Sequence, residues 1–513
     1  MSKFYVTTAI AYVYDAPALH HIYEFVATDV LARYHRLIGD ETFFLTGTDE
    51  HSQNVERRAR EQGVSPQDFS SRMADVFRKS MAEFGISYDR FIRTEDPDHV
   101  RGVQALLEKI KAKGDIYKGA YEGWYCVSCE AFKQDNELKD GYCLIHPTLK
   151  AQWLKEENYF FKLSSYQERL QQHIDKHPEF IQPESRRNEI LGWLKAGLQD
   201  FSISRSTIKW GIPFPGDEQH VVYVWGDALV NYITGVGYGT DEAMFKRWWP
   251  ADLHVIGKDI TRFHTLYWPA MLMSAGLALP KRVFAHGFLT VRGERMSRTV
   301  GNFIAPKDAS DRFGTEGVRY LLLRELPFDR DGDISWETMT DRFNADLAND
   351  LGNFIYRSLS MLQRYFDGKV AAPDGDATAL DKQLQTAFEK AVRGQDKHMK
   401  ALDFTGALDL IWEAVNRGNK YIEESAPWVL AKQSDQRKRL QTVMYNLVEA
   451  IRLTTYLISP FLPETAAKVA AQIKVDLKAP WDTAREWGRL APRTQTALGG
   501  VLFPRIEKPE PVA

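Results

Sequence analysis

The 513-residue sequence predicts an α/β protein with a parallel sheet in its N-terminal part and a helical bundle in its C-terminal third. Runs of β-branched and aromatic residues at 4–14 and 42–46 alternate with a helical apolar period at 20–38. Strands that alternate with helices favour a parallel sheet. After about residue 335 only helical periodicity remains, over 340–366, 384–400, 404–424 and 436–458.

The first part continues with a helix that Ser65 and Pro66 open, as N-cap and first-turn residue. Ligands of parallel sheets bind beyond the carboxyl ends of the strands. In this sequence those ends are 14–17 and 47–51. We therefore expect a binding site there.

The middle of the chain changes character twice. Residues 115–165 hold every cysteine and many aromatic residues, which indicates a small inserted domain. Residues 218–290 return to α/β character. Within them we predict strands at 220–225 and 254–259 and a helix at 263–279.

Composition excludes several classes of protein. Apolar residues make up 44% and charged residues 26%, which rules out wholesale disorder and a fibrous repeat. No apolar run approaches the roughly 18 residues of a membrane span, and the N-terminus lacks the pattern of a secretory leader. The formal net charge of −3 means that any nucleic-acid surface must be local. Three cysteines argue against a disulfide framework, so we expect a reducing cytoplasm.

The cysteines form a pattern typical of zinc. Cys126 and Cys129 are separated by two residues, as are Cys143 and His146. Two such hooks suit a structural Zn²⁺ ion with four filled positions and none for substrate. The alternative, three free thiols and a surface histidine, is disfavoured by the regular spacing.

Seven segments occur together and in order. They are FFLTGTDEHSQ (43–53), EGWYCVSCE (122–130), KEENYFF (155–161), WGIPFPGD (210–217), YVWGDAL (223–229), HVIGKDITRFH (254–264) and GERMSRTVGN (293–302). Through them the chain resembles the methionyl-tRNA synthetases, a family of class I aminoacyl-tRNA synthetases. The resemblance implies a Rossmann-type catalytic domain, split by a connective insertion with a zinc knuckle and followed by an all-α anticodon-binding helical bundle.

The resemblance also implies domain boundaries and an activity. The expected domains are the first half of the catalytic domain (1–114), the insertion (115–218), the second catalytic half (219–290), the signature loop with a stem-contact region (291–338) and the anticodon-binding domain (339–513). Family members activate methionine with ATP and Mg²⁺ to methionyl-adenylate. They then transfer the methionyl group to tRNA.

The resemblance implies an amino-acid pocket in which Asp49 holds the substrate ammonium group. Tyr232 and His264 would supply the polar contacts to the sulfur, within aromatic and aliphatic walls that suit a thioether. Without the resemblance, these residues would be interpreted as ordinary core aromatics. The implied pocket consists of Ile10, Asp49, Trp225, Ala228, Tyr232, Ile260, Phe263, His264 and Trp268.

Both ATP signatures depart from the family pattern. The family's His-Ile-Gly-His falls on residues 18–21, where Ala18 replaces the first histidine and His20 replaces the glycine. The family's Lys-Met-Ser-Lys-Ser falls on 295–299, where both lysines are arginine. The implied catalytic residues are His21, Lys258, Arg295 and Arg298. The implied ATP-binding residues are Ala11, Tyr12, His20, His21, Glu24, Gly257, Asp259, Arg295 and Arg298.

On the tRNA side, Asn353, Arg357 and Trp428 match family positions that read the anticodon, which implies a tRNA with a CAU anticodon. A solvated helix pair and a helix-cap aromatic are the structural alternative. The chain ends soon after the bundle, so we expect a monomer.

Three functions remain open at this point. The first is an active methionine–tRNA ligase. The second is a paralogue that activates a methionine-like amino acid for another pathway. The third is a non-catalytic tRNA-binding module, which the retained amino-acid pocket disfavours.

Overall fold

The computed structural model describes residues 2–127, 131–133, 135–144, 150–296, 302–374 and 376–507. The chain divides into two compact units. One unit comprises 3–17 and 42–286, and the other comprises 1–2, 18–41 and 287–513. No helix of the described residues is long and apolar enough to cross a membrane.

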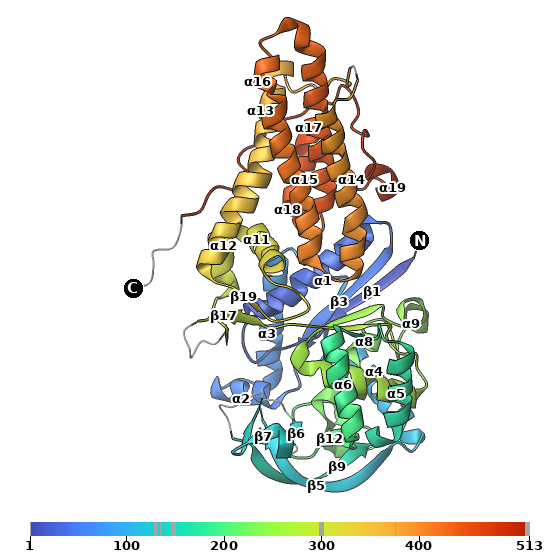
Figure 1. Ribbon diagram of the computed structural model, residues 1–513. Helices are drawn as coiled ribbons and strands as arrows, with labels where there is room; N and C mark the ends of the chain where they lie inside the picture. The colour runs from blue at the N-terminus through green and yellow to red at the C-terminus, as the bar shows by residue number, and fades with distance from the viewer. Residues whose placement is uncertain are drawn as a thin grey trace. The chain divides into compact units, whose positions relative to one another are not determined.

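A seven-stranded sheet forms the centre of the first unit (Figure 1). Its strands run in the order β10-β16-β15-β1-β3-β2, with β4 also on β3. The pairs β1–β15, β15–β16, β10–β16, β2–β3 and β3–β4 are parallel, which confirms the predicted parallel sheet. The bounds are β1 Lys3–Thr8, β2 Ala11–Tyr12, β3 Glu41–Asp49, β4 Arg90–Arg93, β10 Ile181–Gln182, β15 Leu253–Gly257 and β16 Val283–His286.

Most predicted elements of this unit are present. The Oγ atom of Ser65 accepts a hydrogen bond from the Asp68 N–H at 3.0 Å, as expected of an N-cap. The predicted helix at 263–279 is found as η4 (Phe263–Tyr267) and α10 (Trp268–Ala275). The other helices that flank the sheet are α2 Gln53–Glu61, α3 Pro66–Glu83, α4 Pro97–Ala112, α8 Asn231–Thr234 and α9 Glu242–Trp248.

Two strand predictions are only partly right. The apolar run 4–14 is interrupted, because β1 ends at Thr8 and the chain then forms β2, which pairs with the last residues of β3. The run 220–225 also divides: β14 (Asp217–Val222) ends and α7 (Val224–Ala228) begins at once. Gly226 lets α7 pack closely against Ile203, because a Cβ atom there would lie 2.9 Å from Ile203 Cγ1.

The inserted segment forms its own antiparallel sheet, which curves along the bottom of Figure 1. The long strands β5 (Ile116–Cys126) and β9 (Gln152–Phe161) pair from Ile116↔Phe161 to Tyr125↔Gln152. Two short strands extend this sheet, β6 (Ala131–Lys133) and β11 (Phe201–Ser202). Separately, β7 (Leu138–Lys139) pairs with β8 (Tyr142–Cys143), and β12 (Ser204–Arg205) and β13 (Pro213–Phe214) pair with β14. Two helices, α5 (Gln167–Lys176) and α6 (Glu184–Ala196), belong to the same region.

The second unit is mainly helical. Three short strands precede its bundle: β17 Leu289–Val291, β18 Glu294–Arg295 and β19 Gly332–Asp333. Among the described residues after Asp333, every named element is a helix, which confirms the predicted bundle. The long helices are α1 Leu19–Leu37, α11 Pro306–Glu325, α13 Asn353–Phe366, α14 Ala379–Lys400, α15 Phe404–Ser425, α17 Arg437–Ile458 and α18 Pro463–Ile473. The shorter ones are α12 Trp336–Arg342, η5 Phe343–Gly352, α16 Pro427–Leu430 and α19 Trp481–Ala484.

A buried ion pair holds α1 in this second unit. The Nη2 atom of Arg319 on α11 lies 2.7 Å from Oδ2 of Asp29 on α1, and neither side chain is more than 1% exposed. Arg319 also donates from Nε to the carbonyl oxygen of Phe461 at 3.0 Å. Removing one member of such a buried pair is costly, because the other charge stays buried without compensation.

Candidate active site and tRNA-binding surface

A hydrogen-bonded pair of buried side chains lies in the predicted amino-acid pocket. His264 donates from Nδ1 to the Ile260 carbonyl oxygen at 3.0 Å. Its Nε2 atom therefore accepts the proton of the Tyr232 hydroxyl, at 2.7 Å. Burial lowers the pKa of His264 to about 4. The ring is thus neutral at pH 7 and adds no charge to the pocket.

Aromatic side chains surround this pair. Trp225 and Phe263 stack face to face, with ring centroids 3.8 Å apart and planes 5° apart. Trp268 packs 6.2 Å from Tyr232, centroid to centroid. These four residues belong to one apolar cluster, against which Ile10 and Ile260 pack. Asp49, Ala228 and His264 are also buried, at 3%, 5% and 2% exposure.

Asp49 is the last residue of β3, where β2 pairs alongside it through Tyr12. A carboxylate buried at a strand end suits an ammonium group, because a buried charge is tolerated when an opposite charge pairs with it. The next two residues, Glu50 and His51, hold the segment after β3 in place through side-chain hydrogen bonds. Glu50 accepts two hydrogen bonds from Arg93, both at 2.7 Å.

His51 leads to a buried cluster that the sequence interpretation did not identify. Asp227 of α7 accepts from His51 Nδ1 at 2.6 Å and from His99 Nε2 at 2.7 Å. His99 also bonds Thr234 through Nδ1 at 2.8 Å, and His51 bonds Glu95 through Nε2. The end of β3, α4, α7 and α8 are therefore tied together.

The charges in this cluster are strongly coupled. Burial alone would lower the pKa of His51, but Asp227 and Glu95 overcome that effect and raise it to about 10. Burial alone would raise the pKa of Asp227, but His51 and His99 lower it. His51 and Asp227 lie within the quoted segments 43–53 and 223–229. Their proximity in sequence to Asp49 and Trp225 was the available signal.

The residues assigned to ATP divide between the two units. In the first unit, Gly257 ends β15, and Lys258 and Asp259 follow it in η3 (Lys258–Ile260). A Cβ atom on Gly257 would lie 2.8 Å from Asp259 Oδ1, so glycine lets the carboxylate approach the backbone. Ala11 and Tyr12 form β2.

In the second unit, the altered first signature lies at the start of α1. The His21 Nδ1 atom accepts from the Ala18 N–H at 3.0 Å, so the ring satisfies a backbone donor at the helix terminus. Burial and the neighbouring His20 lower the pKa of His21 well below its usual value. The neutral ring then carries its proton on Nε2. Glu24 is buried one turn later, whereas His20 is exposed.

Parts of two predicted sites lie outside the described residues. Arg295 belongs to β18, but its side chain is outside the description, as is Arg298. Cys129 and His146 are outside it too. The other two candidate zinc ligands, Cys126 and Cys143, are buried at 2% and 1% exposure. The described residues include no group of three or more His, Cys, Asp or Glu side chains that could hold a metal ion.

The predicted anticodon residues gather near one end of the helical bundle. Arg357 on α13 donates to Glu423 on α15 at 2.6 Å. Trp428 of α16 lies five residues after Glu423 in the sequence, and it is 37% exposed. The left-handed Ala426 (φ 42°) redirects the chain between α15 and α16. Asn353, one turn before Arg357, is exposed.

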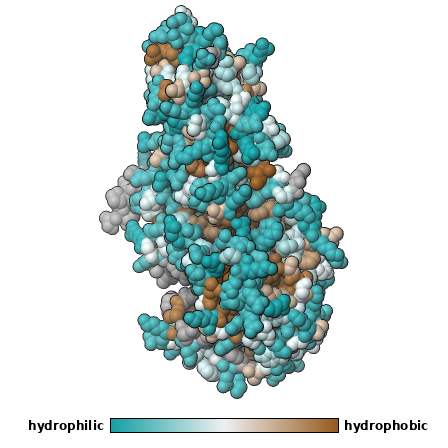
Figure 2. Space-filling model, turned by 45° about the vertical axis from the view of Figure 1, so that its right-hand side comes forward, coloured by the Kyte–Doolittle hydropathy of each residue, from teal (hydrophilic) through white to brown (hydrophobic). Residues whose placement is uncertain are grey.

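Apolar surface accompanies these side chains. Tyr356 and Val429, neighbours of Arg357 and Trp428 in the sequence, are each 44% exposed. Figure 2 shows brown, apolar surface at the tip of the bundle. Exposed aromatic residues beside Asn and Arg are the groups that bind unstacked RNA bases.

A parallel α/β unit with an insertion, a buried cluster of aromatic and polar side chains, and a helical bundle match the architecture of a class I tRNA synthetase. Two family models match: "tRNA synthetases class I (M)" over 4–146 and 133–359, and "Anticodon binding domain of methionyl tRNA ligase" over 372–511. The chain belongs to the methionyl-tRNA synthetase family, the enzymes that ligate methionine to tRNA. ATP and Mg²⁺ are the expected co-substrate and ion of this class.

Individual relatives agree. The chain is 47% identical to the methionine–tRNA ligase of Caldanaerobacter subterraneus subsp. tengcongensis, over 98% of this chain and 79% of that protein. It is 44% identical to the ligase of Thermotoga maritima, over 98% and 80%. The structure of Mycobacterium tuberculosis methionyl-tRNA synthetase in complex with methionyl-adenylate matches with a TM-score of 0.95 and 43% identity, covering 98% of this chain and 100% of that one. These matches support the ligase function and neither of its two alternatives.

Proposed function

We propose that methionine binds in the cluster formed by Trp225, Phe263, Tyr232 and His264, with its ammonium group against Asp49. The observation that carries this proposal is the Tyr232–His264 hydrogen bond of 2.7 Å in a pocket without a cationic ring. A thioether is apolar and accepts hydrogen bonds weakly, so it fits a neutral aromatic pocket with one adjustable hydroxyl. A lysine or glutamate side chain would lack a charge partner there.

The proposed chemistry has two steps. A carboxylate oxygen of methionine attacks the α-phosphorus of ATP, and pyrophosphate leaves with the electrons of the broken P–O bond. A ribose hydroxyl at the 3′ end of tRNA then attacks the carbonyl carbon, AMP leaves, and the hydroxyl proton is released. His21, Lys258, Arg295 and Arg298 would stabilise the charge that develops on the phosphates. The remaining proposed ATP contacts are Ala11, Tyr12, His20, Glu24, Gly257 and Asp259.

ATP–pyrophosphate exchange tests this assignment. Methionine should support exchange best within a panel of amino acids, with or without tRNA. Tyr232→Phe should raise the KM for methionine about tenfold, the scale of one lost hydrogen bond, while Tyr238→Phe, a half-buried tyrosine outside the pocket, should leave it unchanged. Equal KM values for the two variants would contradict the proposed sulfur contact.

For the tRNA, we propose that Asn353, Arg357 and Trp428 bind the bases of a CAU anticodon. The exposed Trp428 beside the Arg357–Glu423 pair supports this role. Trp428→Ala should weaken binding of the CAU tRNA by about 1–3 kcal/mol, the scale of one lost base stack. The control is Trp153→Ala, an exposed tryptophan of the insertion. Unchanged affinity, or equal binding of unrelated tRNAs, would show a structural role only.

We further propose one structural Zn²⁺ ion held by Cys126, Cys129, Cys143 and His146. The burial of both described cysteines supports it, since a closed thiolate site excludes water. Metal analysis should find about one zinc per chain. Folded protein without zinc would refute the site. A monomer in the cytoplasm completes the proposal, and light scattering during size exclusion tests the monomer.

A further inference from the structure

Two buried side chains of the central sheet meet against the Tyr232 ring. In the parallel pair β1–β15, Thr7 is the register partner of His254, so their side chains lie on the same face of the sheet. The Thr7 Oγ1 atom lies 2.8 Å from His254 Nδ1, within hydrogen-bond distance. Both residues are 0% exposed. Neither belongs to the residues assigned above to methionine, ATP, tRNA or zinc.

The imidazole ring of His254 supports one face of Tyr232. The centroids of these two rings lie 4.1 Å apart, with planes 30° apart. The rings of His264 and Trp268 lie farther from Tyr232, with centroid distances of 5.6 and 6.2 Å. Of these three rings, His254 is the one in closest contact with the tyrosine.

A second contact from β1 holds the same tyrosine. Tyr5 lies two residues before Thr7, on the same face of β1, and its hydroxyl donates to the Tyr232 carbonyl oxygen at 2.7 Å. At the far end of the side chain, the Tyr232 hydroxyl bonds His264 Nε2 at 2.7 Å. Tyr232 is thus held at its backbone, at its ring face and at its hydroxyl.

One hydrogen bond sets the rotation of the His254 ring. Its Nε2 atom has no hydrogen-bond partner among the residues that the structure describes, so the bond between Nδ1 and Thr7 orients the ring. Burial and the nearby His264 lower the pKa of His254 well below its usual value, so the ring is neutral at pH 7. A buried polar atom without a partner costs stability, and two apolar residues in place of this pair would avoid that cost. Packing alone therefore does not account for an imidazole at this position.

We propose that His254 is a positioning residue that sets how strongly the pocket prefers methionine over an apolar amino acid of the same shape. Thr7 orients the His254 ring, and that ring supports the face of Tyr232. The Tyr232 hydroxyl then stays at the position where the substrate sulfur is recognised. The inference rests on the proposed contact between Tyr232 and the sulfur, and it requires neither Thr7 nor His254 to touch the substrate.

Norleucine is the amino acid that isolates this effect, because a CH₂ group replaces the sulfur atom of methionine. It fills a similar volume but offers no hydrogen-bond acceptor in the side chain. A general loosening of the pocket should weaken the binding of both amino acids, whereas a displaced Tyr232 hydroxyl should weaken that of methionine alone. The ratio of kcat/KM for methionine to kcat/KM for norleucine therefore measures the positioning.

Two adjacent threonines of β1 provide a matched pair of variants. Thr7→Val removes the bond to His254, and Thr8→Val removes the 2.7 Å bond between the hydroxyls of Thr8 and Thr46. Both threonines are 0% exposed, and each change leaves one buried partner unpaired, so the two losses of stability should be similar. Successive residues of a strand point to opposite faces, so Thr8 lies on the face away from Thr7.

The ratio should separate these two variants. In ATP–pyrophosphate exchange without tRNA, Thr7→Val should lower the ratio about two- to tenfold, the range for one hydrogen bond. The loss should appear in the KM for methionine, with kcat and the KM for ATP retained. Thr8→Val should leave the ratio as it is in the unmutated protein. The same ratio in both variants would overturn the proposal.

A second variant removes the ring itself. His254→Asn keeps an amide that can bond Thr7 but no longer supports the face of Tyr232, so it should lower the ratio at least as much as Thr7→Val. In a Tyr232→Phe background neither change should lower the ratio further, because no hydroxyl is left to position. Additive losses would show that His254 acts on the pocket without Tyr232, which contradicts the proposal.

The outcomes separate this inference from the ligase assignment. If Tyr232→Phe lowers the ratio but Thr7→Val and His254→Asn do not, the sulfur contact stands and the positioning role is overturned. If Tyr232→Phe leaves the ratio unchanged, the proposed sulfur contact fails, and the positioning role fails with it. If the unmutated protein shows no exchange with methionine, the ligase assignment itself fails, and both proposals about the pocket fall with it.

Discussion

The amino-acid pocket and the start of α1 differ in how their polar side chains are engaged. In the pocket, Tyr232 and His264 bond each other and the backbone, and Asp227 holds two histidines. A substitution here leaves a buried polar group without its partner, which costs about 1–3 kcal/mol or more. Folding itself therefore restricts which residues these positions accept.

The start of α1 is restrained less by polar contacts. His20 is exposed, and Ala18, which precedes the helix, is buried but has no polar side-chain atom that needs a partner. The His21 ring accepts a hydrogen bond from the Ala18 N–H, and the His20 ring packs against it, with centroids 4.0 Å apart. Departures from the family pattern can gather here at little cost in stability. The family pattern is thus retained where buried polar side chains bond one another, and it departs where no such network forms.

The largest effect on stability should come from a substitution in the buried cluster beside the pocket. Asp227→Asn removes the charge that two histidines share, and should lower the free energy of unfolding by about 3–5 kcal/mol. Urea denaturation measures it. The control is Asp482→Asn, whose side chain is 88% exposed and should change stability by less than about 0.5 kcal/mol.

The same variant should raise the KM for methionine, since Asp227 connects α7 to the loop after Asp49. It should change the KM for ATP less. If Asp227→Asn matches the control in stability, the cluster does not restrain the pocket, and the contrast between the two regions disappears.

The next effect concerns the start of α1. Reverting Ala18→His together with His20→Gly should raise the rate of adenylate formation at least about 10²-fold, the scale of one restored electrostatic donor. The change at exposed position 20 should alter the unfolding free energy little, whereas the larger ring at buried position 18 should lower it by about 1–3 kcal/mol. ATP–pyrophosphate exchange and urea denaturation on the same samples separate rate from stability.

Two results would revise this picture. If the parent already exchanges at the revertant's rate, the altered signature is catalytically neutral. If neither protein exchanges with methionine, the defect lies away from these two positions.

Local patterns predicted elements better than they predicted contacts. Ser65 and Pro66 identified the start of α3, and the apolar period at 263–279 identified η4 and α10. The strand predicted at 220–225 was only partly right, because the apolar residues of this run are buried partly in β14 and partly in α7. A buried strand and a buried helical turn look alike over six residues.

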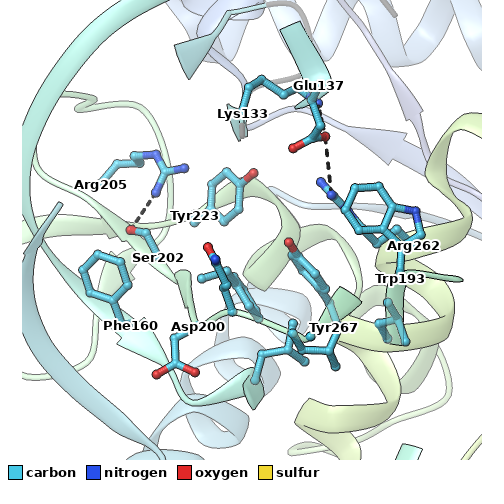
Figure 3. A pocket seen from close by; sticks show the side chains of 16 residues that line it. Lys133, Glu137, Phe160, Trp193, Asp200, Ser202, Arg205, Tyr223, Arg262 and Tyr267 are labelled. Atoms are coloured by element: carbon cyan, nitrogen blue, oxygen red, sulfur yellow. Dashed lines mark hydrogen bonds and ion pairs between the residues drawn. The ribbon is translucent and has the colours of Figure 1, made fainter. Parts of the chain in front are cut away.

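The site shows the same limit. The motif segments contain Asp49 and His264, but they give no sign of the pairing of His51 with Asp227, which lies 176 positions away. The pocket of the first unit that Figure 3 shows likewise takes Lys133, Trp193 and Arg262 from three separate segments. No local signal joins such residues, because their proximity is decided by how the sheet and the insertion pack.

The smallest predicted effect is the pH dependence of the stability that His264 contributes in the pocket. The pKa of His264 is about 4 in the folded chain, below the ordinary value of about 6.5 in an unfolded one. Its contribution to stability is therefore complete above pH 6.5 and is lost as pH falls toward 4, because the unfolded state binds the proton first. At pH 5 the loss should be about 2 kcal/mol.

His254, whose pKa burial also lowers, shares this pH window, so the comparison must cancel it. His264→Gln retains an amide that can bond Tyr232 but does not titrate. The difference in unfolding free energy between this variant and the parent should therefore shrink by about 2 kcal/mol from pH 7 to pH 5. Methionine binding by the parent should stay constant over this interval and weaken only as pH falls toward 4, where the folded ring takes up a proton and can no longer accept the Tyr232 proton. A difference that stays constant with pH would mean that His264 keeps its ordinary pKa. The pocket would then not exclude water from this ring, and the contrast with the start of α1 would weaken.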